Sequence, residues 1–210
     1  DHLMPNTENF HKAINEGIES AKEGNIITFG VKPTRAEQGY GYLEIHSDQS
    51  KFPAKLKKFT EKPDRKTAEQ MAKNKNFMWN AGIFLFKAVD MINAFKAFGK
   101  DLLEPVAASL ESGYDDLGFF RLDPGPWSRC DDISIDYQIM EKIKNLRVVP
   151  LLSSWSDLGG WDSVWKEMAP DKDGVATSKN AHALDCKNTL LRSENTNQQI
   201  VGLGLSDIAA

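Results

Sequence analysis

The residues best suited to chemistry are acids that follow apolar strands and stand beside glycines. Asp157 lies in the segment 155–160, directly after the apolar run 148–152, which predicts a buried strand. Carboxylate oxygens are preferred ligands of hard divalent cations, and glycines let a backbone approach a ligand closely. The segment therefore predicts a ligand-binding turn. A turn in which Asp157 only supports the backbone explains the same residues.

Two other short segments combine glycine or charge with the ends of predicted strands. Gly41, in the segment 39–42, would let a sugar or phosphate lie against the backbone, although a tight turn explains the same glycines. Glu61 can accept hydrogen bonds from two sugar hydroxyls, and the neighbouring Lys62 can meet a phosphate. The competing interpretation of this pair is a solvated strand end.

The remaining candidates are polar residues at the starts of predicted elements. The Asn80 amide both donates and accepts, which suits a vicinal diol, and Gly82 leaves room for a ring, although close packing explains Gly82 equally well. Asp136 follows Ser134, a good helix cap, so its role is structural or ligand-binding. Asp1, judged alone, is a solvated terminal acid.

These residues must be positioned by alternating strands and helices. Strands are predicted over residues 26–31, 43–45, 55–60, 80–86 and 148–152. Helices are predicted over residues 10–21, 65–76, 89–98, 102–110, from 134 onward and 163–168. Asn6 or Thr7 could cap the first helix. Such alternation predicts an α/β architecture, whose ligands sit outside the carboxyl ends of strands. Beyond residue 170, helical periodicity fades and β-structure is expected.

The composition is that of an ordinary globular chain. Its 210 residues carry a formal net charge of −4 without a long basic run, which argues against nucleic acid as a partner. Two unrelated cysteines, no signal peptide and no apolar run of membrane-spanning length predict a cytoplasmic protein without a membrane partner. A homo-oligomer is compatible with the sequence. Because the chain lacks an initial Met and ends within a pattern, we expect it to be a piece of a longer protein.

Taken together, the order and spacing of these segments resemble one family. The matching segments are 1–3, 28–33, 39–42, 59–64, 79–84, 134–137 with 140–142, and 155–159. They resemble the sugar-1-phosphate nucleotidylyltransferases, and within them the members that use mannose 1-phosphate and GTP. The resemblance implies a Rossmann-like mixed sheet, here incomplete. It also implies that residues 1–169 form the sugar-phosphate side of the catalytic domain, and residues 170–210 a linker and the start of a β-rich segment.

The resemblance also implies a reaction and roles for residues. A guanylyl group would pass from GTP to mannose 1-phosphate, giving GDP-mannose and pyrophosphate with the help of Mg²⁺. The family's metal-binding acids correspond to Asp1 and Asp157, which would be catalytic together with the phosphate-binding Lys62. The sugar would be surrounded by Gly41, Glu61 and Asn80, with Gly82 making room and Asp136 as a further candidate.

One departure from the family pattern limits these expectations. The family's glycine-rich triphosphate-binding segment precedes the Asp-His motif and is absent from the 210 residues, so we expect these residues alone not to turn over GTP. Some family members carry a cupin domain with mannose-6-phosphate isomerase activity, which this sequence neither shows nor excludes. The alternative functions are a catalytically silent regulator that binds nucleotide sugar, and an interaction module without a small ligand.

Overall fold

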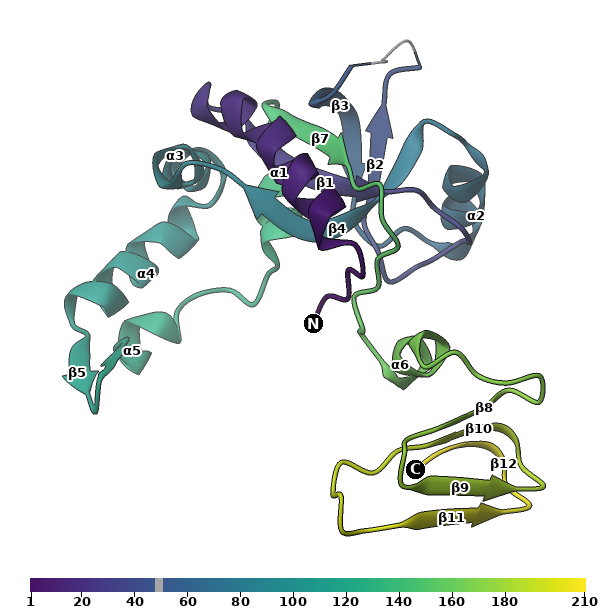
Figure 1. The fold of residues 1–210 in the computed structure, drawn as a ribbon. Coiled ribbons are helices and arrows are strands. Elements are labelled where there is room, and N and C mark those ends of the chain that lie inside the picture. Colours follow the sequence, from purple (N-terminus) through teal and green to yellow (C-terminus); the bar gives the residue numbers. More distant parts are fainter. Residues whose placement is uncertain (48–50) are drawn as a thin grey trace. The chain divides into compact units, whose positions relative to one another are not determined.

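The computed structural model describes residues 1–47 and 51–210 and divides them into two compact units (Figure 1). The first, here called the sheet unit, is Asn6–Ser153. The second, here called the β-rich unit, combines Asp1–Pro5 with Ser154–Ala210. The catalytic-domain boundary near residue 170, expected from the sequence, stays a prediction.

The sheet unit is built on five strands whose pairing closes on itself. The order is β1 (Ile26–Val31), β4 (Phe77–Leu85), β2 (Tyr42–Ile45), β3 (Ala54–Thr60) and β7 (Leu146–Pro150), with β7 returning to β1. The pair β1 and β7 is parallel, and the other pairs are antiparallel. This mixed sheet with flanking helices confirms the predicted α/β class. The six residues of β1 are all buried, which explains why apolar residues predominate along this strand instead of alternating with polar ones.

Helix α1 (Thr7–Lys22) packs on β1, β4 and β7. The predicted cap is confirmed, because the Asn6 side chain accepts the backbone N–H of Asn9 at 3.0 Å. The buried face of α1 consists of small residues. A Cβ on Gly17 would lie only 3.2 Å from the Ile27 side chain, so this glycine permits the close approach of helix and strand. Helix α2 (Arg65–Lys73) packs on β4, and Asp64 is its N-terminal cap.

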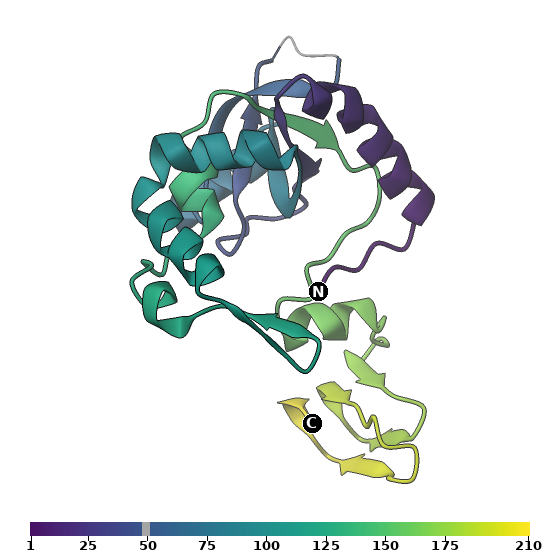
Figure 2. The ribbon, with the colours of Figure 1, turned by 90° about the vertical axis from the view of Figure 1, so that its left-hand side faces the viewer.

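An arm of helices leaves the sheet after β4 and returns before β7 (Figures 1 and 2). It contains α3 (Ala88–Phe98), α4 (Lys100–Glu111), the hairpin of β5 (Tyr114–Asp116) and β6 (Phe119–Arg121), and α5 (Pro124–Trp127). The chain then enters η1 (Asp136–Met140), which packs against α3. The arm thus carries Asp136 back to the sheet.

Among the differences from the sequence-based expectation, two concern the segments that carry candidate residues or lead to them. Instead of a regular helix from Ser134, η1 is a five-residue π-helix in which the Glu141 N–H donates to the Asp136 carbonyl at 3.0 Å. The strand expected over 148–152 lies two residues earlier, ending at Pro150, and Leu152 is 78% exposed. The apolar run therefore extends past the strand into the following loop.

The β-rich unit confirms the β-structure expected beyond residue 170. After α6 (Trp161–Glu167) come β8 (Val175–Thr177), β9 (Ala181–Leu184), β10 (Lys187–Leu191), β11 (Ile200–Leu203) and β12 (Ser206–Ala209). All their pairings are parallel, β8 with β10 and β10 with β12 on one side and β9 with β11 on the other. Leu190 and Leu191 are buried between these stacked strands. In the described part of the chain, no helix is both long and apolar enough to cross a membrane.

Candidate functional site

Asn80, in the middle of β4, is held in one orientation. Its side-chain oxygen accepts the Thr28 hydroxyl at 2.7 Å and the Gly82 backbone N–H at 3.2 Å. Its amide nitrogen therefore faces Asp136 and donates to Oδ1 of that residue at 3.2 Å. Asn80 is 7% exposed, so these bonds link β1, β4 and η1 in a buried setting. The amide that the sequence suggested as a ligand group is rigidly placed.

Glu61, directly after β3, presents a buried carboxylate with one unused oxygen. Its side chain is only 7% exposed, and Oε1 lies 3.3 Å from the Lys62 ammonium. The other oxygen, Oε2, is buried and has no hydrogen-bond partner among the described residues. The Glu61 backbone N–H donates to Glu141 Oε1 at 2.8 Å, which anchors the segment. A buried acceptor without a partner is costly, which makes Oε2 a candidate acceptor for a ligand or water donor.

Gly41 brings β2 close to both of these residues. Its carbonyl accepts the Asn80 N–H at 2.7 Å. A Cβ at position 41 would lie 2.5 Å from Glu61 Oε2 and 3.3 Å from the Asn80 Cβ. Any larger residue here would clash with the carboxylate, so glycine lets the backbone at position 41 pack beside Glu61 and Asn80.

Gly41 and Glu61 lie at the same edge of the sheet, because the carboxyl end of β3 pairs with the amino end of β2. Tyr42, at the start of β2, pairs with Thr60, at the end of β3, and with Trp79 on β4. The candidate residues therefore follow the carboxyl end of β3 and precede the amino end of β2, because the two strands are antiparallel.

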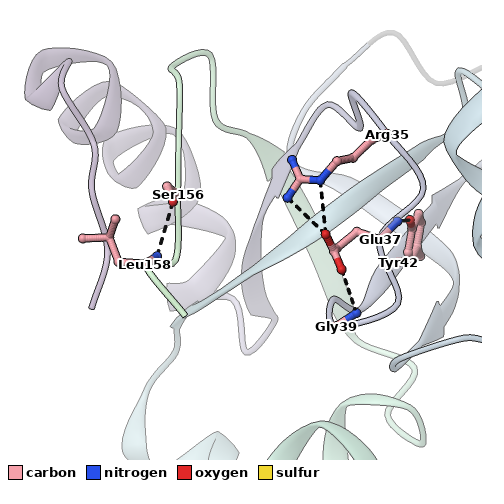
Figure 3. Close-up of polar contacts among 6 residues, drawn as sticks. All are labelled: Arg35, Glu37, Gly39, Tyr42, Ser156 and Leu158. Carbon is pink, nitrogen blue, oxygen red and sulfur yellow. Dashed lines mark hydrogen bonds and ion pairs between the residues drawn. The ribbon is translucent and has the colours of Figure 1, made fainter. Parts of the chain in front are cut away.

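The loop before Gly41 is ordered by a small polar network (Figure 3). The Glu37 carboxylate accepts from the Arg35 guanidinium at 3.1 Å and from the Gly39 N–H at 3.2 Å, while the Glu37 N–H donates to the Tyr42 hydroxyl at 2.9 Å. The Arg35 guanidinium also lies over the Trp79 ring, 5.3 Å from its centroid. These contacts fix the path of the backbone into Gly41.

The pKa values of two carboxyl groups in the cluster are raised. Burial raises the pKa of Glu61, the Asp136 charge raises it further, and Lys62 opposes the rise. Burial also raises the pKa of Asp136, against the lowering effects of its backbone N–H, Lys62 and the Asn80 amide. Two acids of raised pKa beside one lysine make the site able to hold or release a proton next to a ligand.

Gly82 and Lys62 occupy special backbone positions. Gly82 has φ +69°, and an added Cβ would meet no atom within 4 Å. Its left-handed backbone conformation favours glycine, and its role in making room for a ring stays a prediction. Lys62 has φ +43°, and its exposed ammonium is paired with Glu61.

The segments that carry Asp1 and Asp157 lie side by side within the β-rich unit. Leu3 and Ser156 exchange backbone hydrogen bonds of 2.8 and 3.1 Å in an antiparallel bridge. The Trp155 indole N–H donates to His2 Nδ1 at 3.1 Å. The first residues of the chain are thereby tied to the segment around Asp157, although the two are far apart in the sequence.

The turn after Ser156 leaves space for the Asp157 carboxylate. The Leu158 N–H donates to the Ser156 hydroxyl oxygen at 3.3 Å (Figure 3), and Leu158 has φ +46°. A Cβ on Gly159 would lie 2.6 Å from Asp157 Oδ2. Within residues 1–47 and 51–210, no group of three or more His, Cys, Asp and Glu side chains is gathered as a metal site. Two carboxylates fit Mg²⁺, which commonly takes one or two together with phosphate oxygens and waters.

Two supporting residues were not given roles by the sequence analysis. Thr28 and Glu141 lie within the matching segments, yet their partners are 52 and 80 positions away. Only the pairing of β1 with β4 and the return of the arm reveal these contacts. The sequence signal that could have pointed to Thr28 and Glu141 was their position within the matching segments.

Comparisons with known proteins find a matching family model and several similar proteins. A family model described as nucleotidyl transferase matches residues 1–174. Mannose-1-phosphate guanylyltransferases of Sinorhizobium fredii and Salmonella montevideo are each 35% identical, over 100% and 99% of this chain and 41% and 45% of theirs. A solved structure from Thermus thermophilus, described as mannose-1-phosphate geranyltransferase, matches with a TM-score of 0.80 and 26% identity, over 100% of this chain and 59% of that one. The chain thus spans less than half the length of these two curated relatives.

Proposed function

Because this chain belongs to the nucleotidyl transferase family, we propose that it forms the sugar-phosphate side of an enzyme that transfers a guanylyl group from GTP to mannose 1-phosphate. The products are GDP-mannose and pyrophosphate. The two guanylyltransferases that share 35% of their aligned residues with it support this choice of substrates.

The observation that carries the proposal is the unpartnered Glu61 oxygen. Oε2 is buried beside Gly41, next to the fixed amide of Asn80. A sugar hydroxyl donating to this oxygen satisfies it, and a second hydroxyl can bond to the cluster of Asn80 and Asp136. Lys62, on the exposed side of Glu61, meets the sugar's phosphate.

In the proposed reaction the residues position and stabilise rather than react. A phosphate oxygen of mannose 1-phosphate attacks the α-phosphorus of GTP in line, forming a new O–P bond while the bond to the β-phosphate oxygen breaks. Pyrophosphate carries away the bonding electrons. No protein nucleophile is needed, so catalysis consists of orientation and charge stabilisation.

For the divalent metal, we assign Asp1 and Asp157 as its carboxylate ligands. The backbone bridge between Leu3 and Ser156 supports this pairing, since it holds their segments together. When bound, Mg²⁺ supplies positive charge to the phosphate oxygens. Asp157 and Gly159 shape the turn that presents the carboxylate.

The test is turnover of GTP and mannose 1-phosphate by the intact protein that contains this chain, with Mg²⁺ present. Asp157→Asn should keep the fold and lower the rate by about 100-fold or more, because the charge stabilisation supplied by a metal is worth several kcal/mol. Lys12→Gln, on the exposed surface of α1, is the control and should leave the rate unchanged.

The outcomes separate the competing functions. GDP-mannose formation by the parent protein, lost in Asp157→Asn, supports the enzyme. A folded parent that binds mannose 1-phosphate without forming product would instead be the regulatory homologue. Unchanged turnover in Asp157→Asn at saturating Mg²⁺ would show that the metal assignment is wrong.

A further inference from the structure

A cavity lies beyond the last paired residues of β3 and β7. These strands pair only through Ala54 with Val148 and Lys55 with Arg147. The same register, continued, would set Lys58 opposite Lys144 and Glu61 opposite Glu141. The two segments are instead separated by a cavity of about 360 Å³, and they are joined again by the hydrogen bond from Glu61 to Glu141.

The cavity, here called the lysine groove, has an apolar floor and a basic rim. Its floor includes the buried side chains of Phe59, Met140 and Leu146. The rim consists of five lysines: Lys55, Lys57 and Lys58 on β3, and Lys142 and Lys144 after η1. A volume of this size is within the range of small-molecule sites, which combine apolar walls with a few charged groups.

Most of the positive charge in the lysine groove is uncompensated. Lys57 is paired with Glu44 at 2.6 Å, and Lys142 donates to the Gln138 side-chain oxygen at 3.4 Å. The ammonium groups of Lys55, Lys58 and Lys144 have no ion pair with any described residue. Glu141 is the single acid among the described residues that line the groove, and its Oε1 is engaged by the Glu61 N–H. Three unpaired ammonium groups around one cavity match the charge of a diphosphate.

We propose that the lysine groove binds a small organic phosphate, with its phosphate groups on the lysine rim and its ring on the apolar floor. Gly41, Asn80 and Asp136 do not line the groove, so the groove is a different site from that cluster. Its existence does not depend on the proposed guanylyl transfer.

The test is a titration of the ¹⁵N-labelled protein with ADP and, separately, with inorganic pyrophosphate, followed by NMR. ADP should give saturable shifts of the backbone amides of residues 55–58 and 142–144. It should bind more tightly than pyrophosphate, because only ADP can bury a ring on the floor. The double variant Lys58→Gln and Lys144→Gln should weaken ADP binding by about fivefold or more.

The control is a double variant with the same change in charge elsewhere in the sheet unit. Lys12→Gln and Lys96→Gln remove two exposed lysines that lie outside the groove, so ADP binding should match the unsubstituted protein. Shifts confined to other residues, or equal weakening in both double variants, would refute the site. Pyrophosphate binding as tightly as ADP would refute the role of the apolar floor. Unchanged amide signals elsewhere confirm that each variant is folded.

Discussion

At the scale of single residues, the account depends on Glu61. Its carboxylate is buried, one oxygen faces Lys62, and the other has no partner among the described residues. Natural proteins seldom leave such an oxygen unsatisfied without a functional reason. Gly41 and Asn80 border this oxygen, so its surroundings depend on the backbone of β2 as well as on Glu61 itself.

The raised pKa of Glu61 predicts a pH-dependent stability. Above its ordinary value of 4.5, the folded chain holds a proton that the unfolded chain has lost, so the unfolding free energy falls as pH rises toward the folded pKa. Glu61→Gln cannot lose that proton. Its stability relative to the unsubstituted protein should therefore increase as pH rises from 4.5 toward neutrality in urea denaturation. A stability difference that stays constant over this range would contradict the raised pKa.

Gly41 offers a matched pair of substitutions. Gly41→Ala places a Cβ 2.5 Å from Glu61 Oε2 and should weaken mannose 1-phosphate binding by about tenfold or more, since small misplacements at such sites are costly. In Gly39→Ala, the nearest atom is Glu37 Oε1 at 3.6 Å, so its affinity should stay near that of the unsubstituted protein. Calorimetric titration of both variants checks this. Similar affinities in the two variants would remove Gly41 from the site.

At the scale of elements, α2 follows the Glu61–Lys62 pair and is fixed by its cap. Asp64 accepts the Thr67 backbone N–H at 2.8 Å and the Thr67 hydroxyl at 3.0 Å. The backbone hydrogen bond from Thr67 is the main cause that lowers the pKa of Asp64 below its ordinary 3.8. The start of α2 is therefore stabilised by an ionised cap.

This cap predicts a difference between two variants of α2. A lowered pKa adds stability that is complete above pH 3.8 and is lost as pH falls through the folded value. Asp64→Ala should therefore be more destabilising at neutral pH than well below pH 3.8 in chemical denaturation. Asp64→Asn, which keeps a capping side chain, should be destabilised less than Asp64→Ala at neutral pH. Equal losses for Asp64→Ala under both conditions would contradict the ionised cap.

The elements that could be predicted from sequence were those with strong local patterns. The strand Ile26–Val31 and the capped helix Thr7–Lys22 follow from continuous or periodic apolar residues. The π-helix Asp136–Met140 does not, because its widened hydrogen bonding has no local sequence pattern that distinguishes it from a short helix. The parallel pairings of the short C-terminal strands are likewise set by stacking rather than by composition.

The residues of the candidate site could be named from sequence only in part. Gly41, Glu61 and Asn80 were identified from short motifs, and the antiparallel pairing of β2 with β3 and β4 brings them together. The supports from Thr28 and Glu141 could not be assigned, since each acts across a long stretch of chain. The metal-binding roles of Asp1 and Asp157 stay predictions, with their segments joined by one backbone bridge.

At the scale of the whole molecule, charge is distributed unevenly. The chain carries a net charge of −4, yet five lysines surround the groove between β3 and the segment after η1. Local clusters of one sign attract oppositely charged ligands even when the net charge has the other sign. An acidic protein can therefore offer phosphates a favourable surface in its sheet unit.

The central claim is that the sheet unit holds a sugar phosphate at Glu61. The most direct measurement is a crystal structure of the protein with mannose 1-phosphate bound. The account predicts a sugar hydroxyl within about 3 Å of Glu61 Oε2, with the Asn80 amide at a second hydroxyl. A sugar phosphate bound elsewhere, with Glu61 Oε2 still lacking a partner, would contradict it.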